Sequence, residues 1–392
     1  MSYRKLKADC LFDGFNLHTS DRVLVCKPDG TIEAIVEENQ AGGDLEKYSG
    51  LLSPGFVNCH CHLELSHLKG LIPENQGLVN FVFSVISQRN QPEDAKQAAM
   101  QIAETEMLAA GIVAVGDICN TGDSLAIKSY GRLAYYNFIE LLGWSPAQAV
   151  SRYEFGKRVA ALFLAGGQDK KHLSLNPHAP YSVSAELWDL MIPGFQGKTI
   201  TIHNQESAAE NEFFENGGGD LAVMYTRMKI DNARFHAPGS RSLPFYLNKL
   251  KTASRIILVH NTFMEEPDRV EALSFHEQLF FCLCPQANRY IENRLPDIPA
   301  LMKQNDRLVL GTDSLASNRK LSILEEMKLI KQSFPEIPTH RMLVWATSNG
   351  ARVLSFNEKL GDFSAGKKPG IVLVDHVSDG EIGGDSTCRR IL

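Results

Sequence analysis

The apolar positions along the chain follow two patterns. In residues 1–50 apolar and polar positions alternate, and the stretch RVLVCKPDGTIEAIVEE predicts a β-hairpin that turns at Asp29-Gly30. From residue 51 the alternation gives way to short runs that are apolar throughout. After residue 355 the alternating pattern returns in KLGDFSAGKKPGIVLVDHV. The chain therefore has a central part of one kind and two ends of another.

Eight apolar runs are separated by helical stretches, of which 92–110 and 319–334 are the clearest. Strands that are apolar on both faces and alternate with helices form parallel βαβ units. Eight units over about 270 residues fit a (β/α)8 barrel, whose usual size is roughly 250 residues. An open doubly wound sheet is the alternative, but it gives no reason for eight repeats. The runs are GLLSPGFVNCHCH (50–62), GIVAVGDI (111–118), LAYYNFIELL (133–142), HLSLNPH (172–178), TITIHNQ (199–205), RIILVHN (255–261), LFFCLCP (279–285) and LVLGTDS (308–314).

The two alternating ends predict a second, smaller unit. We expect residues 1–50 and 356–392 to pair with each other into a small β domain beside the barrel, which would comprise residues 51–355. The predicted fold class is therefore α/β: a (β/α)8 barrel of the TIM type, with a small β-sandwich domain formed by the N- and C-terminal segments.

Composition narrows the possible functions. The 392 residues are 44% hydrophobic and 22% charged, and the net charge of -6 disfavours nucleic acid, whose phosphates need a basic surface. No apolar run approaches the roughly 18 residues of a membrane-spanning helix, and none follows the N-terminal charges as in a signal peptide. Eight cysteines without secretory features indicate reduced thiols. We expect a cytoplasmic protein with no nucleic-acid or membrane partner.

Polar residues stand where the apolar runs end. A single histidine at such a place would more often be structural, but five of the 12 histidines lie there. In a parallel barrel the carboxyl ends of all strands meet at one mouth, where imidazoles and a carboxylate form a transition-metal site. The residues are His60 and His62 after the first run, His178 after the fourth, His203 after the fifth, His260 after the sixth and Asp313 after the eighth.

The stretch NCHCHLELS (58–66) contains four potential metal ligands in a row. Side chains alternate between the two faces of a strand, so His60 and His62 share one face and Cys59 and Cys61 the other. One ion cannot take ligands from both faces, which argues against a structural zinc knot. We expect the cysteines to be small buried residues that pack against the surrounding helices.

The stretch HNQES places Glu206 three residues after His203, at the start of a helical segment. A carboxylate there can move protons between a water molecule on a metal and a leaving group. Alternatively, it is an ordinary acidic residue favoured by the helix dipole. Both interpretations can hold together.

Taken together, these stretches resemble the amidohydrolase superfamily, over nearly the whole chain and in order and spacing as well as residue type. Within it the chain is most similar to the cytosine deaminase, guanine deaminase and chlorohydrolase branch, whose members hold one catalytic metal. Members with two metals carry a lysine at the end of the fourth strand, where this chain reads HLSLNPHAPYS. The matching stretches are LLSPGFVNCHCHLELS, PHAPYSVS, HNQES, LVHNTF, CPQANRY, GTDSLASN and TSNGARVLSFNEKLGDFSAGKKPGIVLV.

The resemblance implies a ligand set for one divalent ion, zinc first and iron as the alternative. His60, His62, His203 and Asp313 would bind the ion, and His260 would orient and deprotonate the attacking water together with Asp313. Such an ion lowers the pKa of bound water to about 7, which provides hydroxide at neutral pH.

The resemblance also implies the reaction, a hydrolytic deamination of an aminated purine-like heterocycle or nucleoside. Hydroxide on the metal would attack the C–NH2 carbon, and ammonia would be released. Glu206 matches the residue that protonates the ring nitrogen and then the departing amine. His178 matches a substrate contact of the nucleoside-deaminating members.

The substrate is indicated by one loop. HLELS followed by FVFSVISQR resembles the deaminases of 6-aminodeoxyfutalosine, an adenine-containing intermediate of menaquinone biosynthesis. Glu64 and Arg89 are therefore candidate substrate contacts, with surface or supporting charges as the alternative. Asn288, beside Arg289 in CPQANRY, is a third candidate.

Several alternatives remain open from the sequence. The same residues could hydrolyse a C–Cl bond or an amide, as in chlorohydrolases and amidases, or deaminate a guanine- or cytosine-type base. A scaffold without activity would lack a ligand, and none is missing here. We expect a small-molecule substrate as the partner, and a homodimer is a candidate assembly because members of the branch are often dimers.

Overall fold

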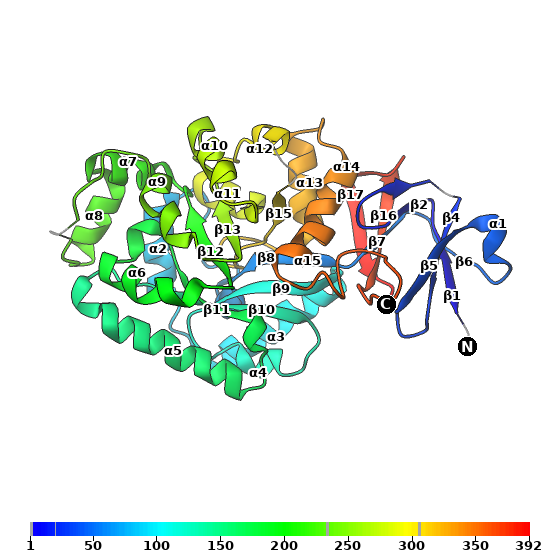
Figure 1. Ribbon diagram of the computed structural model, residues 1–392, viewed down its shortest axis with the longest axis horizontal. Helices are drawn as coiled ribbons and strands as arrows, with labels where there is room; N and C mark the ends of the chain where they lie inside the picture. The colour runs from blue at the N-terminus through cyan, green and yellow to red at the C-terminus, as the bar shows by residue number, and fades with distance from the viewer. Residues whose placement is uncertain (1–2, 20, 233–234, 305–306) are drawn as a thin grey trace.

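Each of the eight predicted apolar runs contains a β-strand. The computed structural model describes residues 3–19, 21–232, 235–304 and 307–392 (Figure 1). The strands are almost entirely buried, because both faces of each are covered by other parts of the chain. They are β8 (Phe56–Cys61), β9 (Ile112–Cys119), β10 (Ala134–Leu141), β11 (Leu173–Pro177), β12 (Thr199–Asn204), β13 (Arg255–His260), β14 (Leu279–Leu283) and β15 (Leu308–Leu310).

These strands form two parallel sheets of four strands each, in the orders β11-β10-β9-β8 and β12-β13-β14-β15. The sheets are joined at the polar ends of the strands. On one side the amide of His203 donates to the carbonyl oxygen of His178 at 2.9 Å. On the other, the amides of Thr312 and Asp313 both donate to the carbonyl oxygen of His60 at 3.0 Å. Residues that end different strands are therefore held close to one another.

Helices connect successive strands. The helix predicted at 92–110 is α3, which begins after Pro92 with two acidic residues in its first turn and ends just before Gly111. Gly111 has φ +79° and lies so close to Val372 that a side chain would collide with it, which explains the glycine. The helix predicted at 319–334 is α13.

The helices that follow the strands differ widely in length. In the described part of the chain, none is both long and apolar enough to cross a membrane. They are α2 (Gly77–Gln88), α3 (Glu93–Ala109), α4 (Leu125–Lys128), α5 (Ala149–Ala165), α6 (Ala185–Met191), α7 (Ala208–Asn216), α8 (Gly219–Arg227), α9 (Ser242–Tyr246), α10 (Glu266–Phe275), α11 (Pro285–Glu292), α12 (Ile298–Gln304), α13 (Ile323–Ser333), α14 (Thr339–Val344) and α15 (Gly350–Val353).

The two ends of the chain meet in one sheet, on the right of Figure 1. A five-stranded sheet has the order β17-β16-β7-β2-β3, so β16 and β17 from the C-terminus pair with strands from the N-terminus. A second sheet, of four strands, has the order β5-β4-β1-β6 and contains the hairpin predicted at Asp29-Gly30. The bounds are β1 (Arg4–Lys7), β2 (Cys10–Phe12), β3 (Leu17–His18), β4 (Arg22–Cys26), β5 (Ile32–Glu37), α1 (Glu38–Ala41), β6 (Glu46–Lys47), β7 (Leu51–Pro54), β16 (Ile371–Ser378) and β17 (Glu381–Arg390).

The first apolar run therefore holds two strands that belong to different sheets. β7 pairs with β16 and β2, whereas β8 pairs with β9. Gly55 stands between them, and a side chain there would lie 2.3 Å from Val113 and 2.7 Å from the carbonyl oxygen of Pro369. Only glycine lets the chain pass from one sheet to the other at this close approach.

The prediction for the two cysteines of NCHCHLELS was partly wrong. Both are fully buried, but Cys59 packs with Val57, Val259 and Cys282, whereas Cys61 belongs to a different apolar cluster. The pairing register of β8 with β9 shifts between Asn58 and Cys61, so strict alternation of side chains fails there.

Candidate active site and metal centre

A cavity of about 340 Å³ lies at the carboxyl ends of the parallel strands. Seven of its lining residues are histidines or carboxylates from six different strand ends or the loops that follow them. Apolar side chains of α2 line another part of the wall. The seven are His62, Glu140, His178, His203, Glu206, His260 and Asp313.

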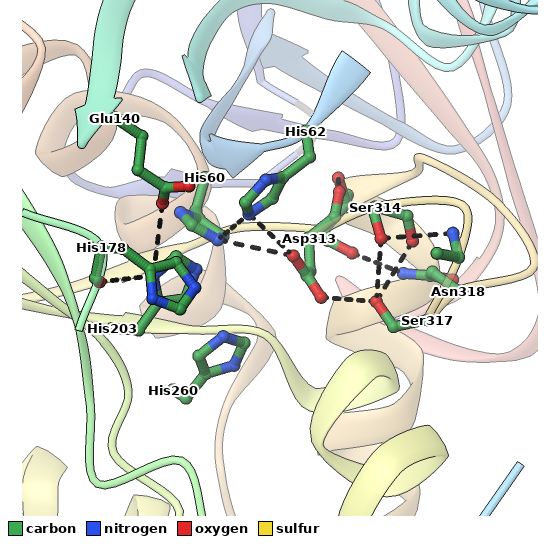
Figure 2. A network of polar contacts seen from close by, with 12 residues as sticks. His60, His62, Glu140, His178, His203, His260, Asp313, Ser314, Ser317 and Asn318 are labelled. Carbon is green, nitrogen blue, oxygen red and sulfur yellow. Dashed lines mark hydrogen bonds and ion pairs between the residues drawn. The ribbon is translucent and has the colours of Figure 1, made fainter. Parts of the chain in front are cut away.

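Three predicted metal ligands converge on one point (Figure 2). His62 Nε2 lies 3.2 Å from His60 Nε2, and Asp313 Oδ1 lies 3.5 Å from His60 Nε2 and 3.3 Å from His62 Nε2. A tetrahedral ion with bonds of about 2.1 Å holds its ligand atoms roughly 3.4 Å apart. The three separations therefore fit a shared divalent cation of that size.

His203 completes this cluster, since its ligand atom lies within 4.8 Å of those of His60 and His62. His203 Nδ1 is 2.7 Å from the carbonyl oxygen of His178. A carbonyl oxygen only accepts, so Nδ1 carries the proton and Nε2 keeps a free lone pair for a metal. The backbone of one strand end thereby sets the tautomer of a ligand on the next.

Asp313 is fixed as an ionised acceptor. The hydroxyl of Ser317 donates to Asp313 Oδ2, which leaves Oδ1 toward the imidazoles. Burial opposes ionisation of Asp313, but His60, His62 and His260 outweigh it and hold the pKa of this carboxyl well below its usual range.

Glu206 and His260 face each other beside the ligand cluster, with Glu206 Oε1 3.6 Å from His260 Nε2. Burial, with a further contribution from Asp313 and Glu292, raises the pKa of the Glu206 carboxyl well above its usual range. Asp313 and Glu206 thus share one cavity but have opposite pKa shifts, as expected of a carboxylate that stays ionised and one that carries a proton.

Four residues at this site have a positive φ angle, a backbone conformation that residues other than glycine rarely adopt. Gln205, His260, Asn261 and Asp313 have φ values of +46°, +72°, +60° and +55°. Such residues cost on the order of 1–3 kcal/mol each and gather at functional sites. Of the four, His260 and Asp313 line the cavity, whereas the side chains of Gln205 and Asn261 are hydrogen-bonded away from it.

Of the predicted substrate contacts, the structure brings His178 and Arg89 to the cavity. His178 Nδ1 lies 2.7 Å from Ser182 Oγ, which leaves its other nitrogen free. Arg89 is exposed at the C-terminal end of α2 and forms no ion pair with a described carboxylate.

Glu64 and Asn288 do not line this cavity. The Glu64 carboxylate accepts hydrogen bonds from the backbone amides of Asn120 and Thr121 at 3.1 Å. Asn288 is buried behind His260, with Oδ1 3.4 Å from His260 Nδ1. Both therefore support neighbouring groups, because their polar atoms are engaged away from the cavity.

Sequence reasoning missed Glu140, which is the last residue but one of β10 and lines the cavity. Its Oε1 lies 3.7 Å from His203 Nδ1, and burial raises the pKa of its carboxyl to about 7. The signal was available, because Glu140 is a charged residue near the end of an apolar run, as the predicted ligands are. Arg152 and Trp144, from α5 and from the loop after this strand, were also missed.

A second cavity of about 730 Å³ adjoins the first and shares Trp144 and Tyr181 with it. Phe213, Tyr225 and Phe245 contribute further aromatic surface to its wall. The predicted metal ligands therefore lie beside a larger aromatic space, which could hold a part of a ligand that extends beyond the reacting group.

Buried imidazoles and a carboxylate at the carboxyl ends of parallel strands are typical of metal-dependent hydrolases. Residues 51–387 match the Amidohydrolase family, and the chain belongs to it. It is accordingly an enzyme, an amidohydrolase that acts on carbon–nitrogen bonds other than peptide bonds, and its relatives include deaminases.

The chain is 26% identical over 363 residues to the aminodeoxyfutalosine deaminase of a Nitratiruptor species, covering 88% of this chain and 84% of that protein. The structure of Helicobacter pylori aminofutalosine deaminase in complex with methylthio-coformycin has a TM-score of 0.79 and 22% identity, covering 96% and 93%. An adenosine deaminase from Xanthomonas campestris with bound zinc has a TM-score of 0.74 and 21% identity, covering 95% and 84%. These two likenesses show the shared fold.

Proposed function

We propose that the protein is a hydrolytic deaminase of an adenine-containing nucleoside, of the aminodeoxyfutalosine or adenosine type. The observation that carries the proposal is the pair formed by Glu206 and His260 beside the converging ligands. The deaminases among the relatives support the same reaction.

His60, His62, His203 and Asp313 would hold one divalent ion, zinc first and iron as the alternative, and the spacing of their ligand atoms supports this set. When bound, the ion would act as a Lewis acid and lower the pKa of a water molecule to about 7. The zinc bound to the adenosine deaminase from Xanthomonas campestris favours that metal.

The protons would be moved by three side chains of this chain. His260 Nε2 and Asp313 would accept the proton of the attacking water. Glu206, kept protonated by its burial, would protonate the ring nitrogen beside the C–NH2 carbon. It would then take the remaining proton of the added hydroxyl and pass it to the departing amine, and the proton held by His260 and Asp313 would return to Glu206. The products would be ammonia and the corresponding oxo compound.

The cavity wall favours a nucleoside with a further substituent over a free base. His178 offers a free ring nitrogen to the heterocycle. Arg89 and Arg152 line the cavity, and neither forms an ion pair with a described carboxylate, so both are available to an anionic group. The adjoining aromatic cavity offers room for a substituent on the sugar.

We also propose that the two parallel sheets close into a (β/α)8 barrel of residues 51–355. The hydrogen bonds from His203 to His178 and from Asp313 to His60 support closure on both sides. Residues 1–50 and 356–392 would then form a separate small β-sandwich domain, which the pairing of β16 with β7 supports and extends to residues 51–54.

The proposal is tested by a screen for product release with the metal-loaded enzyme. The panel contains adenosine, 5′-methylthioadenosine, 6-aminodeoxyfutalosine, guanine and cytosine, with ammonia as readout, and a chlorotriazine with chloride as readout. We expect ammonia from an adenine nucleoside. Ammonia from guanine or cytosine alone, or chloride release, would favour the alternatives. A purified protein that neither contains nor accepts a divalent metal would contradict the ligand set.

A further inference from the structure

Glu140 is the cavity carboxylate that the proposed mechanism leaves without a role. It is 9% exposed and lines the cavity at the end of β10. Its Oε2 accepts a hydrogen bond from Asn120 Nδ2 at 2.8 Å. Its Oε1 lies 3.7 Å from His203 Nδ1, which is too long for a hydrogen bond. Among the described residues, Oε1 therefore has no hydrogen-bond partner.

A second metal ion is the first explanation to consider, because Glu140, His178 and His203 place ligand atoms within 4.8 Å of one another. However, the nitrogen of His203 that faces Glu140 is Nδ1, and this atom already donates to the carbonyl oxygen of His178. Since Nδ1 is engaged, Nε2 is the nitrogen of His203 that is left for the cluster with His60 and His62. The geometry therefore leaves only two ligands for a second ion, which is too few.

A hydrogen-bond donor of the substrate is the better match for Glu140. Asn120 already occupies Oε2, so the lone pairs of Oε1 are the ones left to accept a hydrogen bond at the cavity wall. In an adenine nucleoside the ring nitrogens are acceptors, and the amino group is the one that leaves. The remaining donors are the hydroxyl groups of the sugar.

We propose that Glu140 Oε1 accepts a hydrogen bond from a ribose hydroxyl and thereby selects ribonucleosides over deoxynucleosides. This inference rests on the proposed deamination of an adenine nucleoside. Glu140 is then a specificity-determining residue that touches the sugar.

The surroundings of Glu140 hold its carboxylate in one orientation. Asn120 donates to Oε2, so Oε1 is the oxygen left for the substrate. Asn120 is in turn held by Glu64, whose carboxylate binds the backbone amides of Asn120 and Thr121. Glu64 therefore acts as a positioning residue two steps away from the sugar. This arrangement explains why Glu64 is buried without lining the cavity.

The test compares kcat/KM for adenosine, 2′-deoxyadenosine and 3′-deoxyadenosine in the wild type and in Glu140→Gln, with metal content and folding checked for each. We expect the wild type to prefer adenosine over one deoxynucleoside by at least about tenfold. Glu140→Gln should lower kcat/KM for adenosine by about 10- to 100-fold, because the amide oxygen would stay on Asn120 Nδ2 and the acceptor for the sugar hydroxyl would be lost. The same variant should leave that deoxynucleoside within about twofold of the wild type.

The matched control is Glu104→Gln on α3, which also removes a fully buried carboxylate but one that lies outside the cavity and contacts Tyr135 and Arg132. It should affect all three substrates equally. An equal loss on all three in Glu140→Gln, or a wild type without preference, would overturn the inference while the deaminase assignment stands. If the metal-loaded wild type releases ammonia from no adenine nucleoside, the proposed function itself fails, and the inference fails with it.

Discussion

At the scale of single residues, the surroundings of two carboxyl groups in the site shift their pKa values in opposite directions. Asp313 is surrounded by imidazoles that favour its charge, whereas Glu206 is buried with fewer partners and retains a proton more readily. The same chemical group can therefore serve as a ligand at one point and as a proton donor a few ångströms away. Two substitutions test this separation.

Replacing Glu206 by glutamine removes the proton donor while keeping the size of the side chain. We expect kcat to fall by about 10²- to 10⁴-fold, the usual contribution of a general acid, with little change in KM. Metal content should remain that of the wild type, because Glu206 is not among the proposed ligands. Steady-state kinetics and metal analysis check this, and near-normal kcat in the variant would rule out the proton transfer.

Glu210 makes the stability of the protein depend on pH. Burial raises the pKa of this carboxyl to about 8 in the folded chain, and it accepts hydrogen bonds from the Gln205 amide and the Ser242 hydroxyl. An acid whose pKa is raised by folding contributes its full stabilisation below the unfolded-state pKa of about 4.3 and loses it as pH rises through the folded-state value. Glu210 should therefore destabilise the fold progressively between those two pH values.

Glu210→Gln mimics the protonated acid and should remove this dependence. Thermal unfolding should be measured at pH 5, 7 and 9. The unfolding temperature of the variant should rise relative to that of the wild type as the pH increases. Glu215→Gln is the control, since Glu215 is exposed on the same helix, α7. If the two variants had the same pH profile relative to the wild type, Glu210 would not be the group responsible.

At the scale of secondary-structure elements, the apolar runs predicted all eight strands because burial on both faces leaves a signal in local composition. The runs could not predict the register shift in β8, where Cys59 and Cys61 enter different apolar clusters, because register depends on the partner strand. They also could not predict that Glu64 turns toward Asn120, because the loop after β9 sets that direction. Strand ends located the predicted ligands; side-chain direction in the loops required the structure.

Gly311 follows β15 at a point where the chain packs closely against β8 and β14. A side chain at this position would lie 2.7 Å from the Cβ of His60 and 2.9 Å from the Sγ of Cys282. Gly311→Ala should therefore push β8 away and lower stability by about 1–3 kcal/mol, the usual range for overpacking. It should also weaken metal binding through the displaced His60.

Chemical denaturation and metal titration measure both effects of Gly311→Ala. Gly194→Ala is the control, because no atom outside its immediate neighbours lies within 4 Å of an added side chain there. A Gly311→Ala protein as stable as the control, with unchanged metal affinity, would show that β8 and β15 can separate without cost.

At the scale of the whole molecule, the proposed ligands come from both parallel sheets. His60 lies in β8 and His62 directly follows it, in the first sheet. His203 lies in β12 and Asp313 follows β15, in the second sheet. A bound ion would therefore connect the two halves of the fold. Metal binding to the folded state alone stabilises it by mass action, about 2.7 kcal/mol at a hundred times Kd.

Removal of the metal should accordingly lower the thermal unfolding temperature by several degrees. Calorimetry of chelator-treated protein, before and after addition of Zn²⁺, measures the difference. His60→Ala should abolish the response to Zn²⁺. A transition that does not move when the wild type gains or loses metal would contradict a site that bridges the sheets.

The sheet shared by the two chain ends has a consequence for the order of events during synthesis. β7 is made early, but β16, its neighbour in the sheet, follows only after residues 55–370. At ordinary elongation rates this interval lasts roughly 15–60 s. During that time one edge of β7 has unpaired amides and carbonyls, which can pair with another chain. The nascent protein is therefore open to aggregation at this edge until its last strands emerge.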